Sequence, residues 1–159
     1  MLGLESTVLP MSTLQDQFGD IDIYVFDQLL RGRITPEMCV LDAGCGSGRN
    51  LRWLAANGAR VFAVDRDAAA VERVRELGLD EQHARVAEVD ALPFEDDAFD
   101  AVLAVAVLHF ARDEEHFAAM LDELARVLRP GGILFTRLAS SIGLKPRKTQ
   151  HDAFSRVAA

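Results

Sequence analysis

The chain has 159 residues, half of them hydrophobic, and a formal net charge of −8 at pH 7. This length and apolar content are those of one globular domain with a substantial core. The acidic balance argues against a sequence-independent grip on DNA or RNA, because such binding depends on clustered Lys and Arg that neutralise phosphates. We therefore expect no nucleic-acid partner.

Cysteine use and hydropathy indicate the compartment. Cys39 and Cys45 are the two cysteines, and they lie too close together in the sequence for a spaced disulfide framework, so we expect free thiols in a reducing compartment. The chain has no run of about 18 apolar residues and no basic N-terminal region followed by an apolar core. We predict a cytoplasmic protein with no membrane partner, and we predict no metal site.

The first predicted element is an N-terminal helical segment over residues 1–33, most distinct between Phe18 and Gly32. A short apolar run then ends in Asp42 and opens into a glycine-rich turn, in the sequence VLDAGCGSGRN over residues 40–50. Glycines in such a turn let backbone N–H groups approach a nucleotide-type cofactor. A dinucleotide fingerprint would need a third glycine where Arg49 stands, which disfavours a nicotinamide-dependent oxidoreductase.

Two predicted helices flank a second apolar run, RVFAVD, which ends in Asp65. The helices cover residues 49–57 and 67–77, with apolar residues at helical spacing and a glycine after each. A carboxylate at the end of a second strand can accept hydrogen bonds from both hydroxyls of a ribose. The alternative is that Asp65 caps the helix that begins near Asp67.

A third run, residues 84–94, alternates and contains Asp90, and residues 99–110 are almost entirely apolar. We expect the second of these to be a central strand covered on both faces. Asp90 could instead belong to an Asx-type turn before Pro93. A helix is predicted from Asp113, broken by the Pro-Gly-Gly sequence at residues 130–132 and followed by a strand over residues 133–136.

Strands that alternate with helices predict a parallel sheet covered by helices on both faces. Ligands in such folds bind outside the carboxyl ends of the strands, where the strand order reverses. The acids and glycines named above all follow predicted strands, so we expect them at this one edge.

Five motifs, in order between residues 38 and 138, together resemble those of class I S-adenosylmethionine-dependent methyltransferases. They are residues 40–50, 60–65, 84–94, 99–110 and the sequence LARVLRPGGILF at residues 124–135. The resemblance implies a Rossmann-like doubly wound α/β sheet with strand order 3-2-1-4-5, and S-adenosyl-L-methionine as cofactor with S-adenosyl-L-homocysteine as product. We expect one domain over residues 1–159, composed of the N-terminal segment 1–33, a cofactor-binding core 38–139 and a short basic tail 140–159.

The resemblance also assigns roles to individual residues. On the methionine half of the cofactor, the expected contacts are Asp42, Gly44, Cys45, Gly46 and Gly48 with backbone of Ala104 and Val105. Elsewhere they are Asp65 at the ribose, Asp90 and Ala91 at the adenine, Tyr24, Arg31 or Arg49 at the carboxylate, and Arg66 as a further cofactor-binding residue. His109 follows the fourth predicted strand and is the candidate general base, needed only if the acceptor must lose a proton. His83, His116 and His151 have no such placement.

The sequence departs from the family pattern after the fifth strand, where only residues 138–159 remain and no sixth or seventh strand fits. Residues 133–136 would then form a sheet edge with unpaired backbone groups. Pairing in a homodimer, pairing with a partner protein, and instability are the three expected outcomes. The basic tail could contact an acidic partner or be a solvated chain end.

The motifs predict methyl transfer from S-adenosylmethionine to a small-molecule acceptor. The alternative is a catalytically silent cofactor-binding or interaction module with an incomplete acceptor pocket. The fourth strand lacks the Asp/Asn-Pro-Pro-aromatic sequence of many enzymes that methylate exocyclic base nitrogens, which disfavours amino methylation of DNA.

Overall fold

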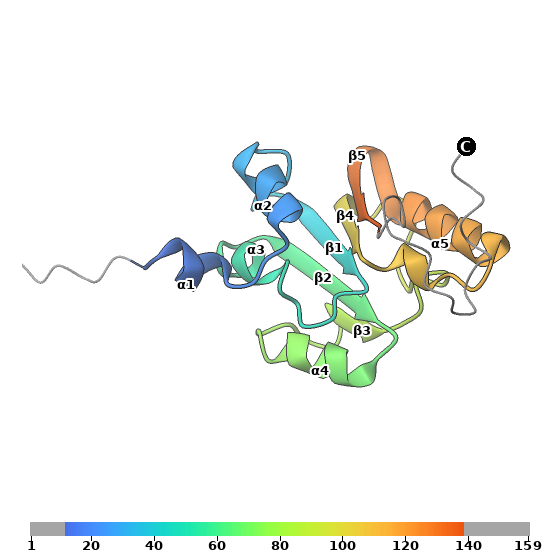
Figure 1. Ribbon diagram of the computed structural model, residues 1–159, viewed down its shortest axis with the longest axis horizontal. Helices are drawn as coiled ribbons and strands as arrows, with labels where there is room; N and C mark the ends of the chain where they lie inside the picture. The colour runs from blue at the N-terminus through green and yellow to red at the C-terminus, as the bar shows by residue number, and fades with distance from the viewer. Residues whose placement is uncertain (1–11, 139–159) are drawn as a thin grey trace, which may run out of the picture.

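The computed structural model describes residues 12–138 (Figure 1). Its helical elements are α1 (Leu14–Phe18), α2 (Ile23–Leu30), α3 (Arg52–Ala56), α4 (Ala68–Arg75), the 3₁₀ helix η1 (Leu108–Phe110) and α5 (Glu114–Val127). Its strands are β1 (Cys39–Ala43), β2 (Arg60–Asp65), β3 (Ala84–Val86), β4 (Phe99–Val105) and β5 (Leu128–Arg137). Among residues 12–138, no helix is long and apolar enough to cross a membrane.

The five strands form one parallel sheet in the order β3-β2-β1-β4-β5. This confirms the Rossmann-like order 3-2-1-4-5 predicted from the sequence. The chain leaves β1 toward β2 on one side and returns through β4 on the other, so the strand order reverses between β1 and β4. A crevice for ligands opens at the carboxyl ends of strands at such a point.

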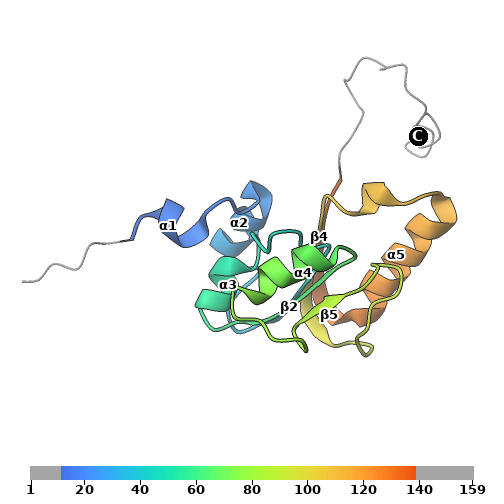
Figure 2. The same ribbon diagram turned by 90° about the horizontal axis from the view of Figure 1, so that it is seen from below.

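Helices cover both faces of the sheet and give the protein two apolar layers. One layer joins the sheet to α2, α3 and α4 through residues such as Val25, Leu54 and Val71, and the other joins it to α5 through residues such as Leu124. Figure 2 shows α2, α3 and α4 grouped together and α5 set apart from them. Every residue of β1 is buried, as expected for a central strand covered on both faces.

Aspartate side chains fix where three helices begin, and each start lies near the carboxyl edge of the sheet. Asp22 accepts a hydrogen bond from the N–H of Tyr24 at α2 (3.0 Å), and Asp67 accepts one from the N–H of Ala69 at α4 (2.9 Å). Asp113 caps α5 in the same way. Such caps satisfy N–H groups that the helix itself leaves free.

Several elements are shorter than the sequence predicts. The alternating run 84–94 forms a strand only as far as Val86, and the apolar run 99–110 leaves the sheet after Val105, because Ala106 adopts a positive φ of 59°. The helix expected over residues 49–57 covers Arg52–Ala56. Apolar periodicity marks burial, and single buried residues outside the sheet, such as Val89 and Leu92 after β3 and Leu108 on η1, extend the apparent strands.

The fifth strand begins earlier than predicted and lies at the sheet edge, as expected. It runs from Leu128 and includes the Pro-Gly-Gly sequence, with a register shift against Phe99 and Ala101 of β4. Gly132 permits this passage, because a Cβ there would lie 2.9 Å from the carbonyl oxygen of Asp100. The basic tail 140–159 lies outside the described residues.

Candidate functional site

The glycine-rich turn after β1 is held against the end of β2. The N–H groups of Gly44 and Cys45 both donate to the carbonyl oxygen of Val64, at 2.8 and 3.0 Å. Gly44 has a φ of 80°, and a Cβ there would lie 2.4 Å from Cγ2 of Val107. A side chain at this position would therefore need both a strained backbone and displacement of the segment after β4.

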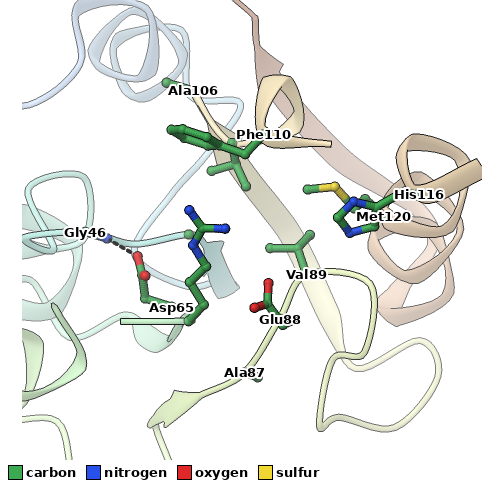
Figure 3. Close-up of a pocket in the computed structure, with 12 residues that line it drawn as sticks. Gly46, Asp65, Ala87, Glu88, Val89, Ala106, Phe110, His116 and Met120 are labelled. Carbon is green, nitrogen blue, oxygen red and sulfur yellow. Dashed lines mark hydrogen bonds between the residues drawn. The ribbon is translucent and has the colours of Figure 1, made fainter. Parts of the chain in front are cut away.

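Asp65, at the end of β2, faces this turn. One carboxylate oxygen accepts a hydrogen bond from the N–H of Gly46 (2.9 Å) and the other accepts one from the N–H of Asp67 (2.9 Å), and Figure 3 shows the first of these. The cap of α4 is Asp67 rather than Asp65. Capping the helix therefore does not account for Asp65, and its half-buried carboxylate lies at the edge of a cavity.

This cavity, which we call the crevice cavity, has a volume of about 310 Å³ and lies where the strand order predicts a ligand. The segments that line it are the glycine turn, the end of β2, the loop after β3, the segment after β4 and the first turns of α5 (Figure 3). Its lining residues are Gly44, Gly46, Asp65, Arg66, Ala87, Glu88, Val89, Ala106, Val107, Phe110, His116 and Met120.

Asp42 is a buried carboxylate without a partner. Its residue is 1% exposed, and neither oxygen has a hydrogen-bond partner among the described residues. Burial raises the pKa of this carboxyl from 3.8 to about 7, and the charge of Arg49 and the neighbouring Asn50 side chain oppose the rise. A buried acid left unsatisfied in this way is stabilised by a cation brought into the site.

Cys45 and the two β4 residues that were predicted to contact the cofactor are buried. Burial raises the pKa of the Cys45 thiol, and the charge of Asp42 raises it further. The thiol therefore stays protonated. Ala104 and Val105 lie within the core, and the cavity is lined by the two residues that follow them, Ala106 and Val107. The two cysteines are free and buried.

Arg66 and Phe110 lie together at the crevice cavity, although they come from opposite sides of it. The Arg66 guanidinium carbon lies 5.4 Å from the centroid of the Phe110 ring, within cation–π range. Phe110 is 58% exposed. Arg66 was among the predicted site residues and Phe110 was not, because an aromatic residue at the end of an apolar run has the sequence pattern of a core residue.

Asp90 and Ala91, predicted at the adenine, are not among the residues that line the crevice cavity. The Asp90 carboxylate lies 3.1 Å from Nε2 of His116 and 3.9 Å from Arg112. Glu88 and Val89 line the cavity instead. Since β3 ends at Val86, the chain reaches the cavity two residues earlier than the apparent strand implied.

His116 lines the cavity, which corrects the sequence-based statement that it has no placement at the ligand edge. Its side chain is 11% exposed, its Nδ1 accepts the N–H of Arg112 at 3.1 Å, and its Nε2 faces Asp90. Its position three residues after the Asp113 cap, in the first turn of α5, was the feature of the sequence that could have indicated this placement. His109 lies on η1, is exposed, and is not among the lining residues.

The three candidates for the cofactor carboxylate occupy different surroundings. Arg49 lies 3.6 Å from the buried Asp22 and donates to the carbonyl oxygen of Asp20 at 3.3 Å. Arg31 is exposed and paired with Asp27 at 2.7 Å on α2 itself. Tyr24 is exposed and lines a second cavity, beside β5.

A glycine turn, an acid after β2 and a crevice at the strand reversal together define a nucleoside-cofactor domain of the Rossmann-like class. A methyltransferase-domain family model matches residues 41–136, more than half of the chain. The chain therefore belongs to the S-adenosylmethionine-dependent methyltransferase family.

Known methyltransferases are similar to this chain in sequence and in structure. The methyltransferase YodH of Bacillus subtilis is 35% identical over 103 residues, which cover 63% of this chain and 42% of YodH. The malonyl-[acyl-carrier protein] O-methyltransferase of Salmonella typhimurium is 34% identical over 100 residues, 62% of this chain and 38% of that protein. The crystal structure of an S-adenosylmethionine-dependent methyltransferase from Mesorhizobium loti superimposes with a TM-score of 0.61 at 25% identity, over 77% of this chain and 56% of that one. The chain thus spans about two fifths of these curated relatives' length.

The residues present fit the cofactor that the family implies. Neither carboxylate oxygen of the buried Asp42 has a hydrogen-bond partner among the described residues, and S-adenosylmethionine carries an ammonium and a sulfonium. The glycine turn is a cradle that a Cβ at Gly44 would disrupt. Asp65 is half-buried at the edge of the cavity.

Proposed function

We propose that this chain transfers a methyl group from S-adenosylmethionine to a small-molecule acceptor. The observation that carries the proposal is the pair of carboxylates, Asp42 and Asp65, on either side of the glycine turn. Asp65 suits the ribose hydroxyls of either cofactor, whereas an acid beside the glycine turn, Asp42, favours a cofactor with positive charge there over the pyrophosphate of a nicotinamide dinucleotide.

In this proposal Asp65 binds the ribose hydroxyls, and the glycine turn and Asp42 bind the methionine half. Arg49 is the candidate that binds the carboxylate of the cofactor. The cofactor supplies an activated methyl on a sulfonium. The chain's contribution is then to bind, to align the acceptor and to exclude water, and alignment alone can supply roughly 7 to 11 kcal/mol of a barrier.

Two pairs of residues are alternatives for binding the adenine. The family resemblance assigns Asp90 and Ala91, whereas the lining of the crevice cavity supports Glu88 and Val89. We propose that the Glu88 carboxylate accepts a hydrogen bond from the adenine amino group. The Asp90 carboxylate then holds the His116 ring in position through its contact with Nε2. Glu88→Gln should then weaken S-adenosylhomocysteine binding several-fold more than Asp90→Asn does, and the reverse order would favour the resemblance.

A role for His109 as general base stays a prediction. Its exposed ring lies on η1. His109→Gln tests it: a large loss of turnover at constant cofactor affinity would support the role, and unchanged turnover would remove it.

A second candidate is a cofactor-binding module that does not transfer the methyl group. It is supported by the family match over residues 41–136, which covers Asp42, the glycine turn and Asp65, all of them assigned to cofactor binding rather than to methyl transfer. The name of the Salmonella enzyme gives its acceptor as a malonyl group on a carrier protein, which supports including acyl compounds in an acceptor panel. Incubation with methyl-labelled S-adenosylmethionine and such a panel decides: labelled product supports the enzyme, and cofactor binding without product supports the module.

A further inference from the structure

A third cavity, which we call the amino-end cavity, lies at the amino ends of the strands and has a volume of about 330 Å³. Cys39, Arg60 and Phe99, the first residues of β1, β2 and β4, line it. Phe62, Arg85 and part of the loop 93–98 complete the lining. The crevice cavity lies at the carboxyl ends of the strands, and the two cavities share no lining residue. A molecule bound in the amino-end cavity would therefore be separate from the cofactor.

Three phenylalanines, Phe62, Phe94 and Phe99, form an aromatic wall of the amino-end cavity. The rings of Phe94 and Phe99 are perpendicular, with centroids 5.0 Å apart, and the Phe62 centroid lies 5.7 and 5.3 Å from theirs. Phe99 is buried, whereas Phe62 and Phe94 are half-buried. Such edge-to-face packing holds the rings in place, and the wall can bury a flat apolar ligand.

Arg85 is fixed at this wall by contacts with backbone and ring. Its Nε donates to the carbonyl oxygen of Gln82 at 3.0 Å and its Nη1 to that of Pro93 at 2.8 Å. Its guanidinium carbon lies 5.1 Å from the centroid of the Phe94 ring. These hydrogen bonds use two of the five N–H donors of a guanidinium, and the rest have no acceptor within the described part of the chain. A side chain already held in place loses little freedom when a ligand binds.

Arg60 brings a second guanidinium to the amino-end cavity. It is exposed, and its Nε donates to Sγ of Cys39 at 3.3 Å. Asp100 attracts Arg60 without contacting it, since both carboxylate oxygens of Asp100 already have partners. The Nη1 and Nη2 groups of Arg60 have no hydrogen-bond acceptor among residues 12–138.

The charges at the amino-end cavity do not cancel. Arg60 and Arg85 form no ion pair within residues 12–138, and Glu95 is the one acid that lines the cavity. Two positive charges and one negative charge leave a formal charge of +1 there, in a chain whose net charge is −8. This local excess of positive charge favours an anion.

We propose that the amino-end cavity binds a small aromatic carboxylate, with its ring on the phenylalanine wall and its carboxylate bound by Arg60 and Arg85. Cavities of about 300 to 1,000 Å³ with mostly apolar walls and a few polar groups are typical of small-molecule sites. Guanidinium groups bind carboxylates through charge-assisted hydrogen bonds. One negative charge balances the +1 of the cavity, whereas the second charge of a phosphate would be repelled by Glu95. The proposed ligand does not depend on methyl transfer.

The test uses the full isotope-labelled chain and benzoate, with amide chemical shifts as the readout. Benzamide lacks the charge of benzoate, acetate lacks the ring, and phenyl phosphate carries a second charge. We expect saturable shifts with benzoate, centred on residues 60–62 and 93–99, and binding several-fold weaker for each of the other three compounds. Benzoate should still bind when S-adenosylhomocysteine is present in excess.

Three variants complete the test. Arg60→Gln should raise the Kd for benzoate several-fold, because it removes charge-assisted hydrogen bonds. Glu95→Gln should lower this Kd, because it removes the one negative charge of the lining. Both side chains are exposed, so neither change disturbs the core. Arg52→Gln is the matched control, since Arg52 is exposed on α3 and lines neither cavity, and its Kd should equal that of the wild type.

The inference is overturned if benzoate causes no saturable shifts, if the shifts lie at the crevice cavity, or if S-adenosylhomocysteine displaces benzoate. It is equally overturned if benzamide, acetate or phenyl phosphate binds as tightly as benzoate, or if the Arg60 and Arg52 variants have the same Kd. Failure of S-adenosylhomocysteine to bind would bear on the proposed function alone.

Discussion

Replacing Asp42 by asparagine should change how the stability of this protein depends on pH. The folded carboxyl has its pKa raised by burial from 3.8 to about 7. Between these values the folded chain holds a proton that the unfolded chain has released. The free energy of unfolding therefore falls as pH rises through this range, and the full penalty is present above about pH 7.

The size of the effect follows from the pKa difference. Each unit is worth about 1.4 kcal/mol, which gives a penalty of roughly 4 kcal/mol as an upper estimate and about 2.5 kcal/mol of change between pH 5 and pH 8. For a domain of this length the latter corresponds to roughly 5 to 10 °C in Tm. An asparagine side chain cannot ionise, so the Asp42→Asn variant lacks this part of the pH dependence.

Thermal unfolding of both proteins across this pH range measures the difference directly, since every other titrating group is shared. We expect the variant to gain stability relative to the wild type as pH rises. A cation bound beside Asp42 should also expel its proton, so that S-adenosylhomocysteine binding near pH 6 releases close to one proton in the wild type and fewer in the variant. Parallel Tm curves for the two proteins would refute the assignment of a buried, unpaired acid.

Three further predictions concern the cofactor site and the sheet edge. Asp65→Ala should weaken S-adenosylhomocysteine binding at least tenfold, because charge-assisted hydrogen bonds are worth about 1.5 to 3 kcal/mol each, and unchanged affinity in calorimetry would remove the ribose assignment. Gly44→Ala should lower Tm more than Gly46→Ala, since both have positive φ but only the first places a Cβ within 4 Å of another group, at Val107; equal Tm values would contradict this. If β5 pairs with a second copy of the chain, Leu134→Lys should reduce the mass in solution to that of a monomer, and a monomeric wild type would exclude this pairing.

The order of the strands could be predicted because the motifs resemble those of a known family. Alternation of apolar runs and helical patterns predicted the parallel sheet, and the resemblance supplied the order. The ends of strands were less predictable. Val89 and Leu92 in the loop after β3, and Leu108 on η1 after β4, are buried outside the sheet. Burial there gives the same apolar pattern as burial in a strand.

The residues of the candidate site at strand ends could be predicted, and those placed by the packing of helices could not. Asp65 and the glycines were predictable, since their positions follow strands whose ends the sequence marks with an acid. His116 and Phe110 were missed because they line the cavity from α5 and η1, and their positions depend on how these elements pack. The Arg137 pair with Asp22 joins residues 115 apart in the chain, and no local pattern indicates such a contact.

The central claim, a site for S-adenosylmethionine, is tested most directly by titration calorimetry with S-adenosylhomocysteine, with NADH as the comparison ligand. We expect micromolar binding of S-adenosylhomocysteine with one site per chain, and no binding of NADH. A folded chain that binds NADH, or that binds neither ligand, would contradict it.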